Sequence, residues 1–196
     1  HKTKRVKDYY QNGEDAWYMI YNDLWLGVSM ITFEFSGKNF YSEEKEAFDL
    51  HSKSKFGVEE ENKIVLSFPE ALYLLKKEKI EVIQDNNVLK FEGILKIGED
   101  IEDTLMERYL VYKDLRERGY IVKSGMKYGS HFRAYRGNME EHAPYIIRVI
   151  PHSKNISPIE ITGDVRVAGS VRKKLIYAFV DEDNSVVYYG ISWEKL

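Results

Sequence analysis

Cysteine is absent from this sequence of 196 residues. Its absence excludes a disulfide scaffold, a thiolate zinc site and a cysteine nucleophile. It also fits a reducing compartment, so we expect a cytoplasmic location. Long apolar stretches are missing as well: the longest uncharged apolar run, residues 24–33, is far too short to span a bilayer. We therefore expect no association with a membrane.

Several catalytic motifs are missing too. No glycine-rich loop is followed by Lys-Ser or Lys-Thr, and no Gly-x-Ser-x-Gly motif occurs, so nucleoside-triphosphate hydrolysis and serine-hydrolase chemistry have no support. Metal-dependent nucleases need an aspartate and a Glu-x-Lys strand that converge on Mg²⁺. The nearest imitation, at residues 60–63, lies in a hydrophilic segment, and we expect it to be solvated surface. We expect neither a metal ion nor a cofactor.

The charges that are present are divided unevenly along the chain. Residues 1–104 contain 14 Lys and Arg against 21 Asp and Glu, whereas residues 105–196 contain 15 against 11. A phosphate-rich partner would be attracted to the second half and repelled by the first. Chance clustering of solvated charges gives the same asymmetry, so the charges alone do not identify a partner.

Capping motifs and turn residues outline the first half of the chain. Aromatic and branched residues predict strands within 15–35, and residues 42–49 fit a short helix or a loop. Ser67 and Glu70 form a capping box around Pro69, which predicts a helix. Two strands are expected within 81–93, about a turn at Asn86-Asn87. The expected buried stripe of the helix consists of Leu72, Leu75 and Ile80.

The second half alternates helices with short strands. Apolar residues repeat at helical spacing over 101–118, and Gly119 is placed to end that helix. A second capping box at 157–160 predicts a helix to about residue 170. Strands are expected at 120–123, 131–135, 145–150, 173–180 and 185–191. This interleaving predicts an α/β or α+β protein with a small N-terminal domain (1–100) and a C-terminal domain (101–196).

Three residues of the second half could together cut RNA without a metal ion. RNA carries its own nucleophile, the 2′-hydroxyl, so cleavage needs a base, an acid for the departing 5′-oxygen and a cation for the phosphorane charge. Tyr135, His142 and Lys173 can fill these roles. A tyrosine base needs a nearby positive charge, because the ordinary pKa of tyrosine is about 10. From the residues alone, it stays open that Tyr135 is an ordinary core residue and Lys173 an ordinary surface residue.

Five segments carry a resemblance to a known family. They are YLVYKDLRERGYIVKSG (109–125), KYGSHFRAY (127–135), EHAPY (141–145), VRVAGSVRKKL (165–175) and, further upstream, SFPEALYLL (67–75). In their order along the chain, these segments resemble the tRNA-intron endonucleases. The upstream segment SFPEALYLL resembles the amino-terminal domain of that family, and the other four resemble its catalytic domain. The resemblance covers residues 50–196 and leaves 1–45 unmatched. It implies a C-terminal catalytic domain similar to the restriction-endonuclease fold.

The resemblance also assigns roles to single residues. It implies that Tyr135 is the base, His142 the acid and Lys173, the first lysine after Ser-Val-Arg, the transition-state cation. It implies that Arg166 packs against a flipped-out bulge base of the RNA. The family often has serine after the histidine, where this chain has Ala143. We expect His131 to be an ordinary surface residue.

The acidic turn Asp181-Glu182-Asp183 resembles the loop through which the family assembles. The resemblance implies that this loop enters a basic groove between partner subunits, and a homotetramer is the simplest arrangement. The implied activity is cleavage of precursor tRNA at bulge-helix-bulge junctions, which leaves a 2′,3′-cyclic phosphate and a 5′-hydroxyl. Two alternatives stay open: a non-catalytic structural subunit of such an enzyme, and a metal-dependent nuclease of related fold.

Overall fold

The computed structural model describes residues 30–137 and 143–194. The expected strands before residue 30 and the candidate acid His142 therefore lie outside the described residues. From Ile31 onward the chain belongs to one compact unit. Within the described ranges, no helix is long and apolar enough to cross a membrane.

The first half builds a six-stranded sheet in the order β3-β4-β2-β1-β5-β6. β1 and β5 are parallel, and the other neighbouring strands are antiparallel. The strands are β1 (Ile31–Ser36), β2 (Asn39–Ser42), β3 (Val58–Glu60), β4 (Lys63–Leu66), β5 (Ile80–Gln84) and β6 (Asn87–Leu89). Between residues 30 and 100, the helices are α2 (Lys45–Ser54), α3 (Phe68–Lys76) and α4 (Phe91–Glu99).

Helix α3 begins at the predicted capping box. Glu70 is buried, and its Oε2 accepts hydrogen bonds from the Ser67 N–H at 3.0 Å and the Ser67 hydroxyl at 2.8 Å. The other carboxylate oxygen of Glu70 accepts from the Gly57 N–H at 2.8 Å. The same carboxylate therefore caps the helix and holds the loop before β3.

The buried stripe predicted for this helix is only partly right. Leu72 is buried, but Leu75 is partly exposed and Leu74 is buried instead. The prediction that Ile80 extends the stripe is wrong, because Ile80 is the first residue of β5. Glu78, with a positive φ of 55°, ends the helical path before that strand.

The helix predicted over 101–118 starts later than expected, because residues 101–104 form a turn after a separate helix that the prediction did not include. α4 ends at Glu99, and α5 (Leu105–Glu117) begins after Thr104, whose φ is 60°. Gly98 makes this sharp turn possible, because a Cβ at that position would collide with Leu105 Cδ2. The missing side chain of Gly98 therefore leaves room for the first residue of the next helix. The helical spacing of apolar residues continues through the break, so spacing alone does not reveal it.

The second half builds a five-stranded sheet in the order β11-β10-β9-β8-β7. β9 and β10 are parallel and joined through α6 (Pro158–Ser170), while the other neighbours are antiparallel. The strands are β7 (Tyr120–Ser124), β8 (Phe132–Arg136), β9 (Tyr145–Pro151), β10 (Lys174–Val180) and β11 (Val186–Ile191).

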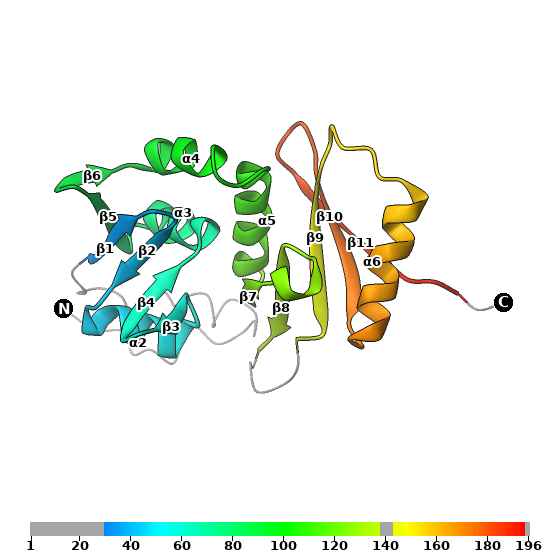
Figure 1. The fold of residues 1–196 in the computed structure, drawn as a ribbon, viewed down its shortest axis with the longest axis horizontal. Helices are drawn as coiled ribbons and strands as arrows, with labels where there is room; N and C mark the ends of the chain where they lie inside the picture. Colours follow the sequence, from blue (N-terminus) through cyan, green and yellow to red (C-terminus); the bar gives the residue numbers. More distant parts are fainter. Residues whose placement is uncertain (1–29, 138–142, 195–196) are drawn as a thin grey trace, which may run out of the picture. The chain divides into compact units, whose positions relative to one another are not determined.

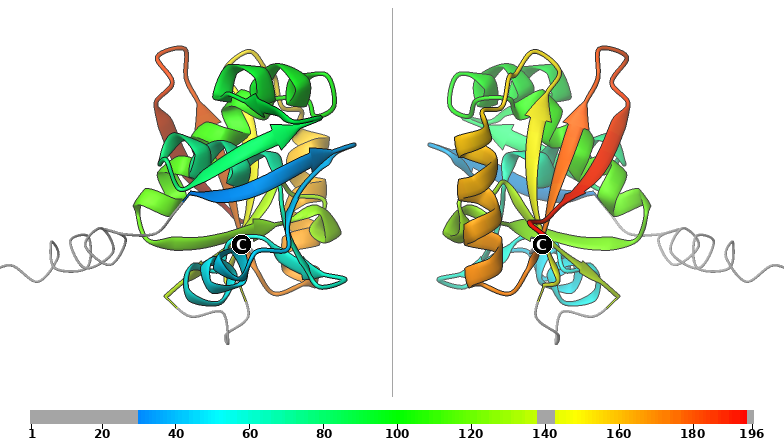
Figure 2. Two further views of the ribbon diagram at one scale, coloured as in Figure 1. Left: turned by 90° about the vertical axis from the view of Figure 1, so that its left-hand side faces the viewer. Right: turned by 90° about the vertical axis from the view of Figure 1, so that its right-hand side faces the viewer.

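Helices α5 and α6 lie on opposite sides of the second sheet (Figure 1). α6 lies beside β9 and β10 (Figure 2), and it packs on β10. The predicted mixed α/β class is confirmed. We retain the division at residue 100 as a proposal.

Two cationic side chains of the second half bind one loop of the first. Arg116 Nη2 donates to the Ser54 carbonyl at 3.0 Å, and its guanidinium carbon lies 4.0 Å from the centre of the Phe56 ring. Lys123 Nζ donates to the Gly57 carbonyl at 2.5 Å. Gly57 has a φ of 67°, and a Cβ there would lie 2.8 Å from neighbouring atoms. Both hydrogen bonds therefore end on backbone carbonyls of a sharply bent loop.

Candidate active site

Tyr135 and Lys173 lie on the same face of the second sheet. Leu175 pairs with Ile146, and both belong to the cluster beneath α6. Arg133 also pairs with Ile146, and residues directly opposite one another share a face. Side chains alternate with a period of two along a strand. Tyr135, two residues after Arg133, and Lys173, two residues before Leu175, therefore belong to the face that α6 partly covers.

The same two residues also lie at the same end of the sheet. Tyr145 on β9 pairs with Ala134 on one side and with Lys174 on the other. Tyr135 and Lys173 are each one residue further toward the same end, so they occupy one row, two strands apart. Neighbouring strands are about 4.8 Å apart, which puts the two backbones about 10 Å apart. A phosphate group between them would be within reach of both side chains.

Tyr135 is largely buried, with 6% of its surface exposed. The guanidinium carbon of Arg133 lies 5.8 Å from the centre of its ring, so a positive charge does stand beside this tyrosine. Arg133 Nε is itself buried and makes no hydrogen bond to any described residue. A guanidinium therefore stands next to the candidate base, and its Nε donor is unused among the described residues.

The backbone conformation of Lys173, just after the end of α6, is fixed by a hydrogen bond and by the residue before it. Its backbone N–H donates to the Ala168 carbonyl at 2.9 Å, and Arg172 before it has a left-handed φ of 54°. Its Nζ donates to the Ala143 carbonyl at 2.6 Å. That carbonyl belongs to the residue directly after His142, so the ammonium is attached to the loop that carries the candidate acid. Since the acceptor is a backbone atom, alanine in place of the family's serine leaves this contact unchanged.

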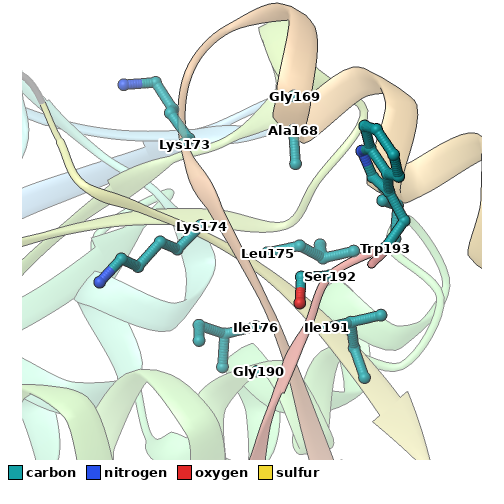
Figure 3. A pocket seen from close by; sticks show the side chains of 11 residues that line it. Ala168, Gly169, Lys173, Lys174, Leu175, Ile176, Gly190, Ile191, Ser192 and Trp193 are labelled. Atoms are coloured by element: carbon teal, nitrogen blue, oxygen red, sulfur yellow. The ribbon is translucent and has the colours of Figure 1, made fainter. Parts of the chain in front are cut away.

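A cavity of about 420 Å³ lies beside Lys173 and Lys174, between α6, β10 and β11 (Figure 3). Leu175 and Ile191 contribute to its lining, and the indole of Trp193 lies next to α6. Figure 3 shows that the ammonium groups of Lys173 and Lys174 lie away from this indole. The cavity is therefore not where the candidate catalytic ammonium points.

A second tyrosine, which sequence reasoning missed, stands next to Lys173. The Lys173 Nζ lies 5.3 Å from the centre of the Tyr128 ring, and the Lys127 Nζ lies 5.0 Å from it. The pKa of Tyr128 is lowered by a hydrogen bond with the Lys127 side chain and by the charges of Lys127, Lys173 and Arg133. Tyr128 and Lys173 are far apart in the sequence, so no local pattern announces this contact.

The expectation that His131 is an ordinary surface residue is wrong. His131 is half-buried, and its Nδ1 accepts a hydrogen bond from the Val149 N–H at 2.9 Å. Burial, together with the positive charges of Arg108, Arg148 and Lys154, lowers the pKa of His131 to about 4. This histidine is therefore a neutral structural residue that connects the turn before β8 with β9.

Helix α6, which carries Arg166, is tied to the sheet by a partly buried ion pair. Arg148 of β9 forms an ion pair with Asp164, and the Tyr177 hydroxyl donates to Asp164 Oδ2 at 2.6 Å. Arg148 also approaches Glu160 at 3.4 Å. Arg166 itself is exposed and forms no ion pair with any residue that the structure describes.

The acidic turn between β10 and β11 is exposed. The Asp181 N–H donates to the Ser185 carbonyl at 3.0 Å, and Asp183 Oδ1 accepts from the Ser185 N–H at 2.9 Å. Hydrogen bonds from the Ser185 side chain and from the Ser185 N–H lower the pKa of Asp183. Glu182 Oε1 lies 3.7 Å from His152 Nε2. The three carboxylates are thus presented at a loop tip whose shape two of these residues help to fix.

The segment 60–63 that imitates a metal-nuclease motif is a hairpin turn. Glu60 pairs with Lys63, and Glu61 and Asn62 have φ angles of 47° and 64°. Throughout the described ranges, no three His, Asp or Glu side chains gather in a way that could hold a metal ion.

Comparison with known proteins identifies the class of this site. The family model for the catalytic C-terminal domain of tRNA intron endonucleases matches residues 105–188, so the second sheet belongs to an endoribonuclease. The model for the N-terminal domain of the same family matches residues 31–95 and begins within the segment 1–45 that the sequence resemblance left unmatched.

Individual relatives agree with this result. The tRNA-splicing endonuclease of Thermococcus kodakarensis is 47% identical over 167 residues, which is 85% of this chain and 99% of the relative. Those of Pyrococcus furiosus and Methanococcus vannielii are 42% and 46% identical, and the matches cover 85% and 78% of this chain and 98% and 88% of the relatives. The chain belongs to the tRNA-intron endonuclease family, as the resemblance predicted.

Proposed function

We propose that this chain cuts precursor tRNA at bulge-helix-bulge junctions without a metal ion and leaves a 2′,3′-cyclic phosphate and a 5′-hydroxyl. Its family membership and the names of its relatives support the substrate class. The observation that carries the chemistry is the shared row of Tyr135 and Lys173, two strands apart on one face of the sheet.

Each of the three residues has one role in the proposed step. Tyr135 takes the proton of the 2′-hydroxyl, and the freed oxygen attacks the adjacent phosphorus. His142 gives a proton to the 5′-oxygen as the bond between phosphorus and that oxygen breaks. Lys173 stabilises the negative charge that builds up on the phosphorane oxygens. The carbonyl of Ala143, which holds the lysine, follows His142 directly and so supports a joint placement of acid and cation.

Assembly and RNA capture are part of the same proposal. The exposed loop Asp181-Glu182-Asp183 would bind a basic groove of another copy and so assemble a homotetramer. In this assembly two active sites would be spaced to reach the two bulges of the RNA. Arg166, exposed and without an ion pair among the described residues, would stack on a flipped-out base. The cytoplasm is the proposed location of the enzyme.

Cleavage in excess EDTA is the first test. Purified protein should cut a bulge-helix-bulge RNA at the same rate with EDTA and with Mg²⁺, and the product ends should carry a cyclic phosphate. Strict dependence on Mg²⁺ would favour the metal-dependent alternative. No cleavage in either buffer would favour a structural subunit that needs a catalytic partner.

Matched variants then test the roles of the residues. His142→Ala should lower the single-turnover rate by about 10²–10⁴, the usual contribution of a general acid. Lys173→Ala should lower it by about 10²–10³, the usual contribution of a group that stabilises developing charge. The controls are His152→Ala and Lys174→Ala, which change the same residue types at exposed positions outside the row.

Because His152 lies near Glu182 of the acidic turn, light scattering should first show that its variant assembles like the wild type. Equal losses of rate in a variant and its control would show that overall charge, not position, matters.

A further inference from the structure

Tyr128 is held in place by a rigid turn. It ends the short 3₁₀ helix η2 (Met126–Tyr128), and its N–H donates to the Gly125 carbonyl at 2.8 Å. Gly129 follows with a φ of 65°, and its N–H donates to the Met126 carbonyl at 2.9 Å. A Cβ on Gly125 would lie 2.7 Å from the backbone of Phe132, so this turn lies directly against the start of β8. The position of the Tyr128 backbone is therefore fixed before any RNA binds.

The ring of Tyr128 has an apolar side and a cationic side. It is half-buried and packs against the cluster beneath α6 that includes Ile146, Val165 and Leu175. The Lys173 ammonium approaches to 5.3 Å from the ring centre. A cation within about 6 Å of an aromatic ring is attracted to the negative face of the ring. The pKa of Tyr128 is lowered first by a hydrogen bond with the Lys127 side chain and then by the positive charges around the ring, Lys173 among them.

These contacts indicate what the Tyr128 ring does, and this inference rests on the proposed function of Lys173. We propose that Tyr128 is a positioning residue, whose aromatic ring holds the Lys173 ammonium at the place where the reacting phosphate binds.

The physical reason lies in the freedom of a lysine side chain. A free lysine loses rotamer entropy when it is fixed in one conformation. Here the ammonium already has two contacts, the Ala143 carbonyl and the Tyr128 ring. An ammonium has three N–H donors, so a donor remains for a phosphate oxygen. Fixing the group before the reaction makes its charge effective without reorganisation in the transition state.

The alternative is that Tyr128 only fills space in the core. Both explanations predict some loss of stability when the ring is removed, so stability does not separate them. They differ in cleavage rate, because a core filler has no reason to act through Lys173. They also differ in how the rate responds to the electron density of the ring.

Single-turnover cleavage at saturating RNA tests the proposal. Tyr128→Leu should lower the rate by about 2- to 30-fold, the range of a cation–π contact, with little change in RNA affinity. Tyr128→Phe, which keeps the ring, should rescue the rate. In a Lys173→Ala background, Tyr128→Leu should cause no further loss, since contacts that act through one residue are not additive. Tyr120→Leu, which removes a half-buried tyrosine ring from β7 of the second sheet, is the matched control and should not slow cleavage.

The results separate this inference from the function on which it rests. Full activity of Lys173→Ala would overturn the proposed role of the lysine. Inactive Lys173→Ala beside fully active Tyr128→Leu would overturn only the role of the tyrosine. So would a Tyr128→Leu loss that persists without Lys173, or a Tyr128→Phe variant as slow as Tyr128→Leu.

A second measurement avoids any large change of shape. Phenylalanines with one, two and three ring fluorines at position 128 nearly keep the size of the ring while weakening its negative face. The rate should fall step by step with fluorination if the ring attracts the ammonium. A flat series would overturn the proposal even if the leucine variant fails to fold.

Discussion

His131 should make the stability of this protein depend on pH, and its replacement by asparagine should remove that dependence. In the folded protein the His131 Nδ1 accepts a hydrogen bond from the Val149 N–H, so a proton on Nδ1 would abolish the bond. The proton would also add a charge in a half-buried site near Arg108 and Arg148. The substitution His131→Asn keeps an acceptor at a similar distance from the backbone, because the asparagine Oδ1 corresponds to the histidine Nδ1, but it does not titrate.

The magnitude follows from the two pKa values. The pKa of His131 is about 4 in the folded protein and 6.5 in its ordinary state, so between these values the unfolded chain binds more protons. Stability that is fully present above pH 6.5 is therefore lost as the pH falls toward 4. At about 1.4 kcal/mol for each pH unit, the full loss is about 3 kcal/mol, and most of it is reached by about pH 4.5.

The assay is urea unfolding followed by circular dichroism between about pH 7.5 and 4.5. Carboxylates that titrate in this range affect both proteins alike, so the difference between wild type and His131→Asn isolates the histidine. The free energy of unfolding of the wild type should fall by about 2 to 3 kcal/mol more than that of the variant. Parallel curves would refute the reasoning and show that the pKa of His131 is nearly the same in the folded and the unfolded protein.

Two further predictions concern RNA capture and assembly. Arg166→Ala should weaken binding of the bulged RNA by about 1–3 kcal/mol, the usual contribution of base stacking. Arg166→Lys should not restore binding, because an ammonium does not stack as a plane; a fully active lysine variant would show that charge alone suffices. Replacing Asp181 and Asp183 with asparagine keeps side-chain oxygens that can accept the turn's hydrogen bonds but removes two charges. Light scattering should then report species smaller than a tetramer, and added salt should act on the wild type in the same direction; an intact tetramer that still cuts RNA would contradict the proposed loop contact.

Local chemistry decided which parts of the fold could be predicted from the sequence. The second capping box is one example: the Ser157 hydroxyl accepts from the Glu160 N–H at 3.2 Å, and α6 begins there. The turn at Asn86 is another, with φ angles of 49° and 63° at Asp85 and Asn86. In both cases the residues that define the feature are neighbours in the chain, so their pattern is visible before folding.

Contacts between distant segments decided what could not be predicted. The break before α5 depends on the space that Gly98 leaves, and the burial of His131 depends on β9 lying across it. Tyr128 and Lys173 come close only when folding brings η2 next to the end of α6, on one face of the sheet. The shared row of Tyr135 and Lys173 follows from strand register, which the family resemblance does not show. The catalytic roles of the three candidate residues stay predictions.

The contacts of Arg116 and Lys123 with the loop at 54–57 have a consequence for protein engineering. Because both donors bind backbone carbonyls, they recognise the path of the chain and not the identity of its side chains. Ser54 should therefore accept many substitutions, which makes it a suitable position for a fluorescent label or a crosslinker. Gly57 should accept almost none, since its φ of 67° and its crowded Cβ position both require glycine.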